Sequence, residues 1–277
     1  MNIIEFITNN LPTFLALVGT GIFAGILAGL LGVGGGIVIV PVLFFLFQSF
    51  GVSPESAMLV ATATSLATII PTSISSIRSH NKKGNVDFDL LKRWSLFILI
   101  GVLAGSWLVT RVDGTLLTIL FGVIATLSAL NMLFRTGKSA LFEQLPGKGG
   151  QGVMGSSVGF FSAMVGIGGG TLSVPLLTAY NYPAHKAVGT AAAIGLIISL
   201  PGALTMLALG STPADAPAGT LGLVNFVGFI CIVPLTVLFA PVGASIAAKL
   251  DAAKLKKVFA VVLLITGLRM LAQLFLS

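Results

Sequence analysis

Charged residues are scarce in this sequence. Lysine, arginine, aspartate and glutamate make up 8% of its 277 residues, whereas a soluble domain carries about 25%. Hydrophobic residues make up 56%, so polar side chains could not cover a surface that faces water. This composition excludes a soluble enzyme, a disordered chain and a disulfide-stabilised scaffold, and it predicts a polytopic membrane protein.

Residues that carry out catalysis or bind metals are also few. Cys231 is the single cysteine, so no intramolecular disulfide can form. The two histidines and eight acidic residues show no spacing typical of a metal site or a catalytic triad. No acidic residue lies in the middle of a hydrophobic segment, so nothing supports a proton relay through a buried carboxylate. We therefore expect no catalysis, no metal and no cofactor.

The hydrophobic residues are grouped into ten segments. A bilayer core of about 30 Å requires roughly 20 apolar residues in a helix. Two segments are short for a full crossing, and each follows a glycine cluster, so each is expected to be a half-helix or one arm of a hairpin. The segments are 12–31, 36–50, 56–77, 94–110, 115–134, 152–166, 170–181, 185–209, 222–248 and 258–276, of which 36–50 and 170–181 are the short ones.

An internal repeat divides the chain. Residues 32–43 read Gly-Val-Gly-Gly-Gly-Ile-Val-Ile-Val-Pro-Val-Leu, and residues 166–177 read Gly-Ile-Gly-Gly-Gly-Thr-Leu-Ser-Val-Pro-Leu-Leu. Further similarities align Val86-Asp87-Phe88 with Val224-Asn225-Phe226 and Ala61-Thr62-Ala63-Thr64 with Ala187-Val188-Gly189-Thr190. The sequence predicts two copies of one unit, at 1–134 and 151–277, joined by a cytoplasmic linker at 135–150.

The charges predict that the two copies are inverted in the membrane. Each copy has five segments, an odd number, so the second copy must enter from the opposite side. The loop 78–93 holds five Lys and Arg residues and is expected in the cytoplasm, whereas its counterpart at 210–221 holds none. The net charge of +7 is explained by this bias, and no basic patch suggests a nucleic-acid partner. We expect an all-α polytopic transmembrane protein of the cell inner membrane, built from two inverted-topology repeats with glycine-broken helical hairpins.

The glycine clusters are the first candidate site. A glycine run interrupts a helix, and inside a membrane such a break is tolerated only where it faces protein or water. The helix that follows then offers free N–H groups and a positive dipole end to an anion. Gly34, Gly35 and Gly36 in one copy and Gly168, Gly169 and Gly170 in the other are the predicted contacts. The alternative is that these glycines only allow close helix packing.

These motifs resemble the TauE/SafE family of sulfite-exporter-like membrane proteins. The resemblance rests on the pattern Gly-x-Gly-Gly-Gly-x-x-x-Val-Pro-x-Leu, present at Gly32–Leu43 and Gly166–Leu177, and on the adjoining stretches Thr64–Ser73 and Ala187–Thr190. It implies export of small sulfur-containing anions such as sulfite, sulfoacetate or other organosulfonates.

Hydroxyl groups are the second set of candidate ligands. Thr64, Thr68, Thr72 and Ser76 recur every four residues and predict one polar face of a helix. Thr64, Ser65 and Thr190 accompany the family pattern and are the preferred substrate contacts. The alternative is that these hydroxyls bond to helix carbonyl groups.

Two arginines complete the candidate residues. Arg78 is expected at the inner mouth, where it would attract anions or would only mark the cytoplasmic side. Arg269 lies inside the last segment, and its repeat counterpart is Asn131, so this position is not symmetric. An arginine inside a membrane segment is a functional candidate, although its position near the chain end also allows the side chain to reach the membrane surface.

The sequence as a whole favours a transporter that works by alternating access. Its expected partners are a small anionic substrate and the lipid bilayer. A passive anion channel and a membrane assembly factor without transport remain the alternatives. The sequence leaves the coupling ion and the oligomeric state open, with a homodimer as one candidate arrangement.

Overall fold

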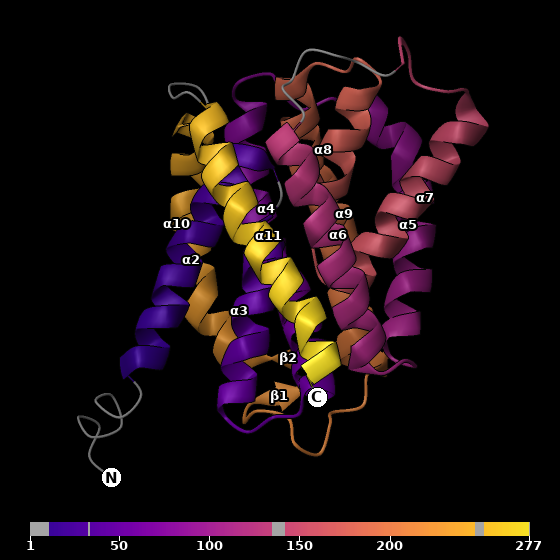
Figure 1. The fold of residues 1–277 in the computed structure, drawn as a ribbon. Helices are drawn as coiled ribbons and strands as arrows, with labels where there is room; N and C mark the ends of the chain where they lie inside the picture. The colour runs from indigo at the N-terminus through magenta and orange to yellow at the C-terminus, as the bar shows by residue number, and fades with distance from the viewer. Residues whose placement is uncertain (1–10, 33, 135–141, 247–251, 277) are drawn as a thin grey trace.

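The structure, a computed structural model, describes residues 11–32, 34–134, 142–246 and 252–276, and these are almost entirely helical (Figure 1). The helices are α2 (Leu11–Leu31), α3 (Gly36–Ser49), α4 (Pro54–Asn81), α5 (Phe88–Val109), α6 (Gly114–Phe134), α7 (Lys148–Val165), α8 (Gly170–Ala179), α9 (Ala184–Leu209), α10 (Phe226–Ile246) and α11 (Ala252–Leu276). Among them α4, α6, α9 and α10 are long and apolar enough to cross a membrane. The predicted all-α polytopic architecture is confirmed.

Several helices begin or end beyond the hydrophobic segments that predicted them. The helix α5 begins at Phe88 because Asp87 caps it, six residues before the expected start at 94. The helix α7 begins at Lys148, inside the expected linker. The segment expected at 222–248 becomes helical only at Phe226, because a short hairpin of β1 (Thr220–Leu221) and β2 (Val224–Asn225) precedes it.

The helices α4 and α9 form the centre of the molecule. The apolar part of α4 is 78% buried inside the protein. Leu66 of α4 lies against Gly202 of α9, and Ser73 lies against Gly195. From the first contact to the second, the residue number rises in α4 and falls in α9. The two helices therefore run antiparallel.

Six of the remaining helices pair across the two halves of the chain, whereas α3 and α8 pack mainly against α4 and α9 of their own halves. The helix α2 packs along α10, α5 packs along α7, and α6 packs against α11. Glycines allow the main chains to approach: a Cβ atom at Gly29 would lie 1.8 Å from the Ala240 carbonyl oxygen, and one at Gly101 would lie 2.0 Å from that of Ser156. Small residues in membrane proteins commonly permit such close contacts.

The same close contacts occur in both halves. A Cβ atom at Gly105 of α5 would lie 2.5 Å from the carbonyl oxygen of Phe160 in α7. A Cβ atom at Gly243 of α10 would lie 1.9 Å from that of Ile26 in α2. Gly105 and Gly243 are 138 positions apart, the same offset that aligns Val86-Asp87-Phe88 with Val224-Asn225-Phe226. The two glycines are therefore equivalent in the internal repeat, and their packing is equivalent too.

Contacts between loops define the two ends of the helical bundle. In Figure 1 the loop between α9 and β1 lies at the lower end, and Asp215 of this loop accepts hydrogen bonds from Ser53 and Ser56. The loops between α4 and α5 and between α8 and α9 lie at the upper end, and there Tyr182 donates to Asp87. The helix α2 runs parallel to α10, from the lower end to the upper end, whereas α7 runs parallel to α5 in the opposite direction (Figure 1).

These glycine contacts can be tested by adding a single methyl group. We expect Gly105→Ala and Gly243→Ala each to lower the midpoint of thermal unfolding in detergent, because the new Cβ meets a main-chain oxygen that cannot move alone. Overpacking of this kind costs about 1–3 kcal/mol. Gly149→Ala is the matched control, since no atom lies within 4 Å of its added Cβ. Unchanged midpoints in the first two variants would contradict the packing described here.

Candidate functional site

The two glycine clusters meet at the centre of the molecule. A Cβ atom at Gly34 would lie 3.6 Å from the Cα atom of Gly168, and one at Gly36 would lie 2.6 Å from the carbonyl oxygen of Gly166. All these glycines are buried. The helices α3 and α8 start from this meeting point, at Gly36 and Gly170. The structure therefore places the two clusters next to each other, and of the six predicted glycines it brings Gly34 and Gly168 into direct contact.

Each break in the chain rests on the long central helix of the other half. Gly32 has a φ angle of +66°, and its added Cβ would lie 2.3 Å from the carbonyl oxygen of Val188 in α9. Gly166 has a φ angle of +69°, and its added Cβ would lie 2.7 Å from that of Thr62 in α4. Both positions need glycine for the left-handed conformation and for the close approach. Val188 and Thr62 are also equivalent in the internal repeat, so the contact is reciprocal.

Atoms of neighbouring helices fill the space beside Gly35 and Gly169. A Cβ atom at Gly35 would lie 2.9 Å from the carbonyl oxygen of Ala24, and one at Gly169 would lie 2.5 Å from the Ile194 side chain. In this conformation neither break leaves space beside these two glycines. A larger side chain at either glycine would therefore disturb the fold. Substitution of these glycines therefore cannot separate binding from folding.

Free polar groups surround the second break. Ser65 donates to the Gly166 carbonyl oxygen at 2.7 Å, which ties α4 to the break. None of the described residues accepts a hydrogen bond from the N–H groups of Gly168, Gly169 and Gly170. Four buried hydroxyls on the helices next to the break also lack a partner in the described part of the chain: Thr62, Ser73, Ser162 and Thr171. Sequence reasoning missed Ser162 and Thr171, since only their place in the fold distinguishes them from other hydroxyls.

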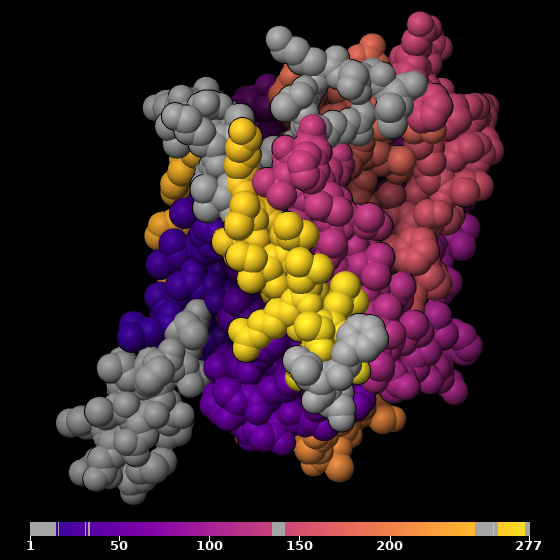
Figure 2. Space-filling view, in the orientation of Figure 1, coloured from indigo at the N-terminus to yellow at the C-terminus, as the bar shows by residue number. Residues whose placement is uncertain are grey.

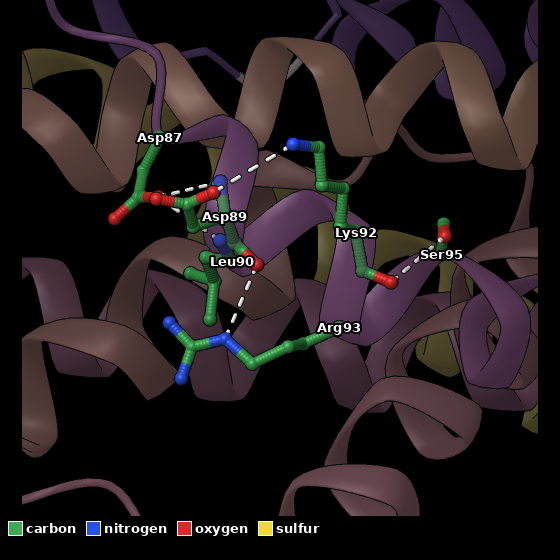
Figure 3. Close-up of polar contacts among 6 residues, drawn as sticks. All are labelled: Asp87, Asp89, Leu90, Lys92, Arg93 and Ser95. Atoms are coloured by element: carbon green, nitrogen blue, oxygen red, sulfur yellow. Dashed lines mark hydrogen bonds and ion pairs between the residues drawn. The ribbon is translucent and has the colours of Figure 1, made fainter.

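Thr64 and Thr190, two of the predicted substrate contacts, each hold the start of a helix in this structure. Thr64 accepts from the N–H of Asn225 at 2.8 Å, and Thr190 accepts from the N–H of Asp87 at 3.0 Å. Asp87 caps α5 by accepting from the N–H groups of Asp89 and Leu90 at 3.0 and 2.9 Å (Figure 3). Asn225 caps α10 by accepting from the N–H of Gly228 at 2.8 Å. The two threonines thus form equivalent bonds between the halves.

The other hydroxyls of the predicted polar face of α4 also contact protein. Thr68 donates to the Ser65 carbonyl oxygen, Thr72 pairs with the hydroxyl of Thr236 at 2.6 Å, and Ser76 donates to the Ala28 carbonyl oxygen. The hydroxyls of this face therefore bond to α4 itself and to neighbouring helices, as the alternative interpretation expected.

A polar clasp joins the two halves at each end of the molecule. The upper clasp is made of Asp87, Tyr182 and Thr190. Burial raises the pKa of Asp87, but hydrogen bonds from the Tyr182 hydroxyl and the N–H groups of Leu90 and Asp89 outweigh it, so the pKa is lowered overall. Burial, together with Asp87, raises the pKa of Tyr182.

The lower clasp is made of Asp215, Ser53 and Ser56. Hydrogen bonds from the Ser56 hydroxyl and the Ser53 N–H lower the pKa of Asp215 to about 2. Both clasp carboxylates are therefore ionised at neutral pH, and each accepts hydrogen bonds from the opposite half.

Arg78 lies away from the glycine breaks, at the upper end. Together with Lys82 it lines a cavity of about 430 Å³ between α4 and α10, whose walls also include Pro71 and Pro241. The Arg78 side chain is exposed. His80, on the same turn, is instead buried and contacts the Gly29 carbonyl oxygen at 2.9 Å. Among the described residues no cluster of three His, Cys, Asp or Glu side chains could hold a metal ion.

Comparisons with known proteins identify the family. The family model described as "Sulfite exporter TauE/SafE" matches residues 17–270. The chain belongs to the TauE/SafE family. Among its relatives, a probable membrane transporter protein of Haemophilus influenzae is 30% identical over 90% of this chain and 95% of the relative. Others from Methanocaldococcus jannaschii and Bacillus subtilis are 28% and 27% identical, over 92% and 94% of this chain and 94% and 98% of the relatives.

No solved structure is significantly similar to this TauE/SafE chain. The family and its relatives establish a multi-pass membrane transporter, which has a small-molecule substrate and a lipid environment. Membership in a transporter family also favours transport over catalysis. The resemblance drawn from the double glycine motif is confirmed.

The reciprocal threonine bonds can be tested with paired variants of this TauE/SafE protein. Thr64→Val leaves the buried N–H of Asn225 unpaired, and Thr190→Val leaves the half-buried N–H of Asp87 unpaired. An unpaired buried donor costs about 1–3 kcal/mol. We expect both to lower the thermal unfolding midpoint by similar amounts, and Thr64→Ser to retain most of the stability. A threonine-to-valine change that is harmless at either position would show that the hydroxyl does not hold the helix start.

Proposed function

We propose that this protein exports small sulfur-containing anions, such as sulfite, sulfoacetate and other organosulfonates, across the inner membrane by alternating access. The observation that carries the proposal is the meeting of two chain breaks, one from each half, between α4 and α9. Each break is followed by the N-terminus of a short helix, α3 or α8. Helix N-termini with free N–H groups attract anions through their positive dipole ends.

The chemistry beside the second break supports an anionic substrate. The N–H groups of Gly168–Gly170 and the hydroxyls of Ser73 and Thr171 are hydrogen-bond donors without a partner among the described residues. A sulfite or sulfonate group accepts hydrogen bonds at three oxygens and donates none when ionised. Donors in a site closed to water would bind it strongly, since hydrogen bonds to charged groups are worth about 1.5–3 kcal/mol.

The helix directions support two inverted repeats as the moving parts. The equivalent helices α2 and α7 run in opposite directions, and equivalent glycines meet equivalent partners in both halves. Inverted repeats allow one protein to form two conformations that open to opposite sides. In our proposal the upper and lower clasps break in turn, since each connects loops of opposite halves at one end.

The charge distribution supports export rather than uptake. Five cations lie at the upper end of the molecule, either at the end of α4 and in the loop that follows it or in the first turns of α5: Arg78, Lys82, Lys83, Lys92 and Arg93. Because cytoplasmic loops carry excess Lys and Arg, we assign the upper end to the cytoplasm. The cavity lined by Arg78 and Lys82 would concentrate anions at this entrance. An inside-negative potential then drives anions outward without a coupled ion.

Transport by the purified protein tests this proposal. We expect liposomes containing the protein to release sulfite and sulfoacetate with saturable kinetics, and external substrate to accelerate the release. Ser73→Ala should lower transport about tenfold, because a lost bond of about 1.4 kcal/mol changes binding tenfold. Folding should be retained, since the Ser73 hydroxyl has no partner among the described residues.

Ser106→Ala is the matched control, since Ser106 is equally buried but bonds to Val102 of its own helix. Release that never saturates would indicate a channel. Liposomes that release none of the sulfur-containing anions would refute the proposed function.

A further inference from the structure

A second cavity, separate from the glycine breaks, lies between α2, α3 and α11. Its volume is about 390 Å³, within the range of small-molecule sites. Its walls include Phe23 of α2, Val38 and Phe45 of α3 and Leu263 of α11. Arg269 of α11 is the one charged residue among the described residues that line it. Figure 2 shows α11 crossing this face of the molecule between α2 and α6.

Arg269 has no counter-charge in the described part of the chain. Its guanidinium carbon lies 4.3 Å from the centre of the Phe45 ring, and it forms no ion pair with a described carboxylate. It lies seven positions before Leu276, the last residue of α11, which corresponds to about 10 Å along the helix. One turn closer to that end, the Gln273 side chain donates to that of Gln48 in α3. The guanidinium therefore lies deeper than the polar contact that joins α3 and α11.

Arg269 is exposed at the protein surface, so this cation is accessible to an anion from outside the chain. Charged side chains within membrane segments are costly and commonly mark a substrate or ion pathway. Stacking on Phe45 fixes the plane of the guanidinium and leaves its N–H groups available for a planar or tetrahedral anion. The apolar walls, however, offer an inorganic anion no hydrogen bonds over most of the cavity.

We infer that this cavity binds an organic anion with an apolar body. Its sulfonate or carboxylate head contacts the Arg269 guanidinium, and its body lies against Phe23, Val38 and Leu263. Burial of apolar surface favours such a ligand by about 25 cal/mol per Å². In naming a substrate class, this inference rests on the proposed function and favours organosulfonates over sulfite; binding to the cavity itself does not depend on transport.

The cavity is placed where a transported anion would pass. Ile37 and Val38, which line it, belong to the first turn of α3 and directly follow Gly34–Gly36. The cavity thus extends from the first glycine break toward the lower end of the molecule. The position equivalent to Arg269 in the first half is Asn131, so only one half carries the cation. The molecule therefore has one such site, and this site lies toward the lower end, which we assign as the exit.

Thermal unfolding of the full-length protein in a neutral detergent tests this inference. We expect hexanesulfonate to raise the unfolding midpoint saturably, because a ligand that binds only the folded state stabilises it. Sulfite and hexylammonium should have no effect at the same concentrations. Arg269→Gln should weaken the apparent affinity for hexanesulfonate at least tenfold, and Arg269→Lys should weaken it less.

Arg111→Gln is the matched control. Arg111 also stacks on an aromatic ring, with its guanidinium carbon 5.4 Å from the centre of the Trp107 ring, but it does not line the cavity. Hexanesulfonate should therefore bind this variant with unchanged affinity.

Three results separate the possibilities. If Arg269→Gln binds hexanesulfonate as the unchanged protein does, the inference is wrong, even when liposomes export anions. If binding depends on Arg269 but liposomes transport nothing, the inference stands and the proposed function fails. If phosphatidylglycerol in nanodiscs gives an Arg269-dependent stabilisation that hexanesulfonate never gives, the occupant is a lipid and the inference is overturned.

Discussion

The structure depends on one contact made twice, in which a break in one half is held by the central helix of the other. Gly32 lies on the main chain of α9 at Val188, and Gly166 lies on that of α4 at Thr62. Backbone groups exposed by a break cannot be left in lipid, because nothing there satisfies them. Packing each break inside the other half solves this problem, and it explains why the two halves are interleaved rather than placed side by side.

The reciprocal arrangement also connects the centre to both ends. Thr64 and Thr190 hold the starts of α10 and α5, and the clasps of Asp215 and Asp87 lie on the loops that lead into these helices. A displacement of α4 against α9 would therefore affect the breaks and the clasps together. Such coupling is what a carrier requires, since the site must close on one side before it opens on the other.

Much of this architecture could be predicted from the sequence, because hydrophobic length and repeated motifs are local signals. The ten segments, the short helices α3 and α8 and the family were all predicted in this way. The hairpin at Thr220–Asn225 was not, since its residues continue a hydrophobic run and only their pairing distinguishes them. The partners of Thr64 and Thr190 could not be predicted either, because they lie more than 100 residues away in the chain.

The opposite orientation of the two halves is the central claim, and membrane-side labelling tests it most directly. Cys231 is first replaced by serine, and a single cysteine is then introduced at Lys82 or at Ala214, both of which are exposed loop residues. An impermeant thiol reagent added outside intact cells should label the cysteine at 214 but not the one at 82 until the membrane is opened. Labelling of both cysteines from the same side would contradict the inverted arrangement and the alternating-access account that depends on it.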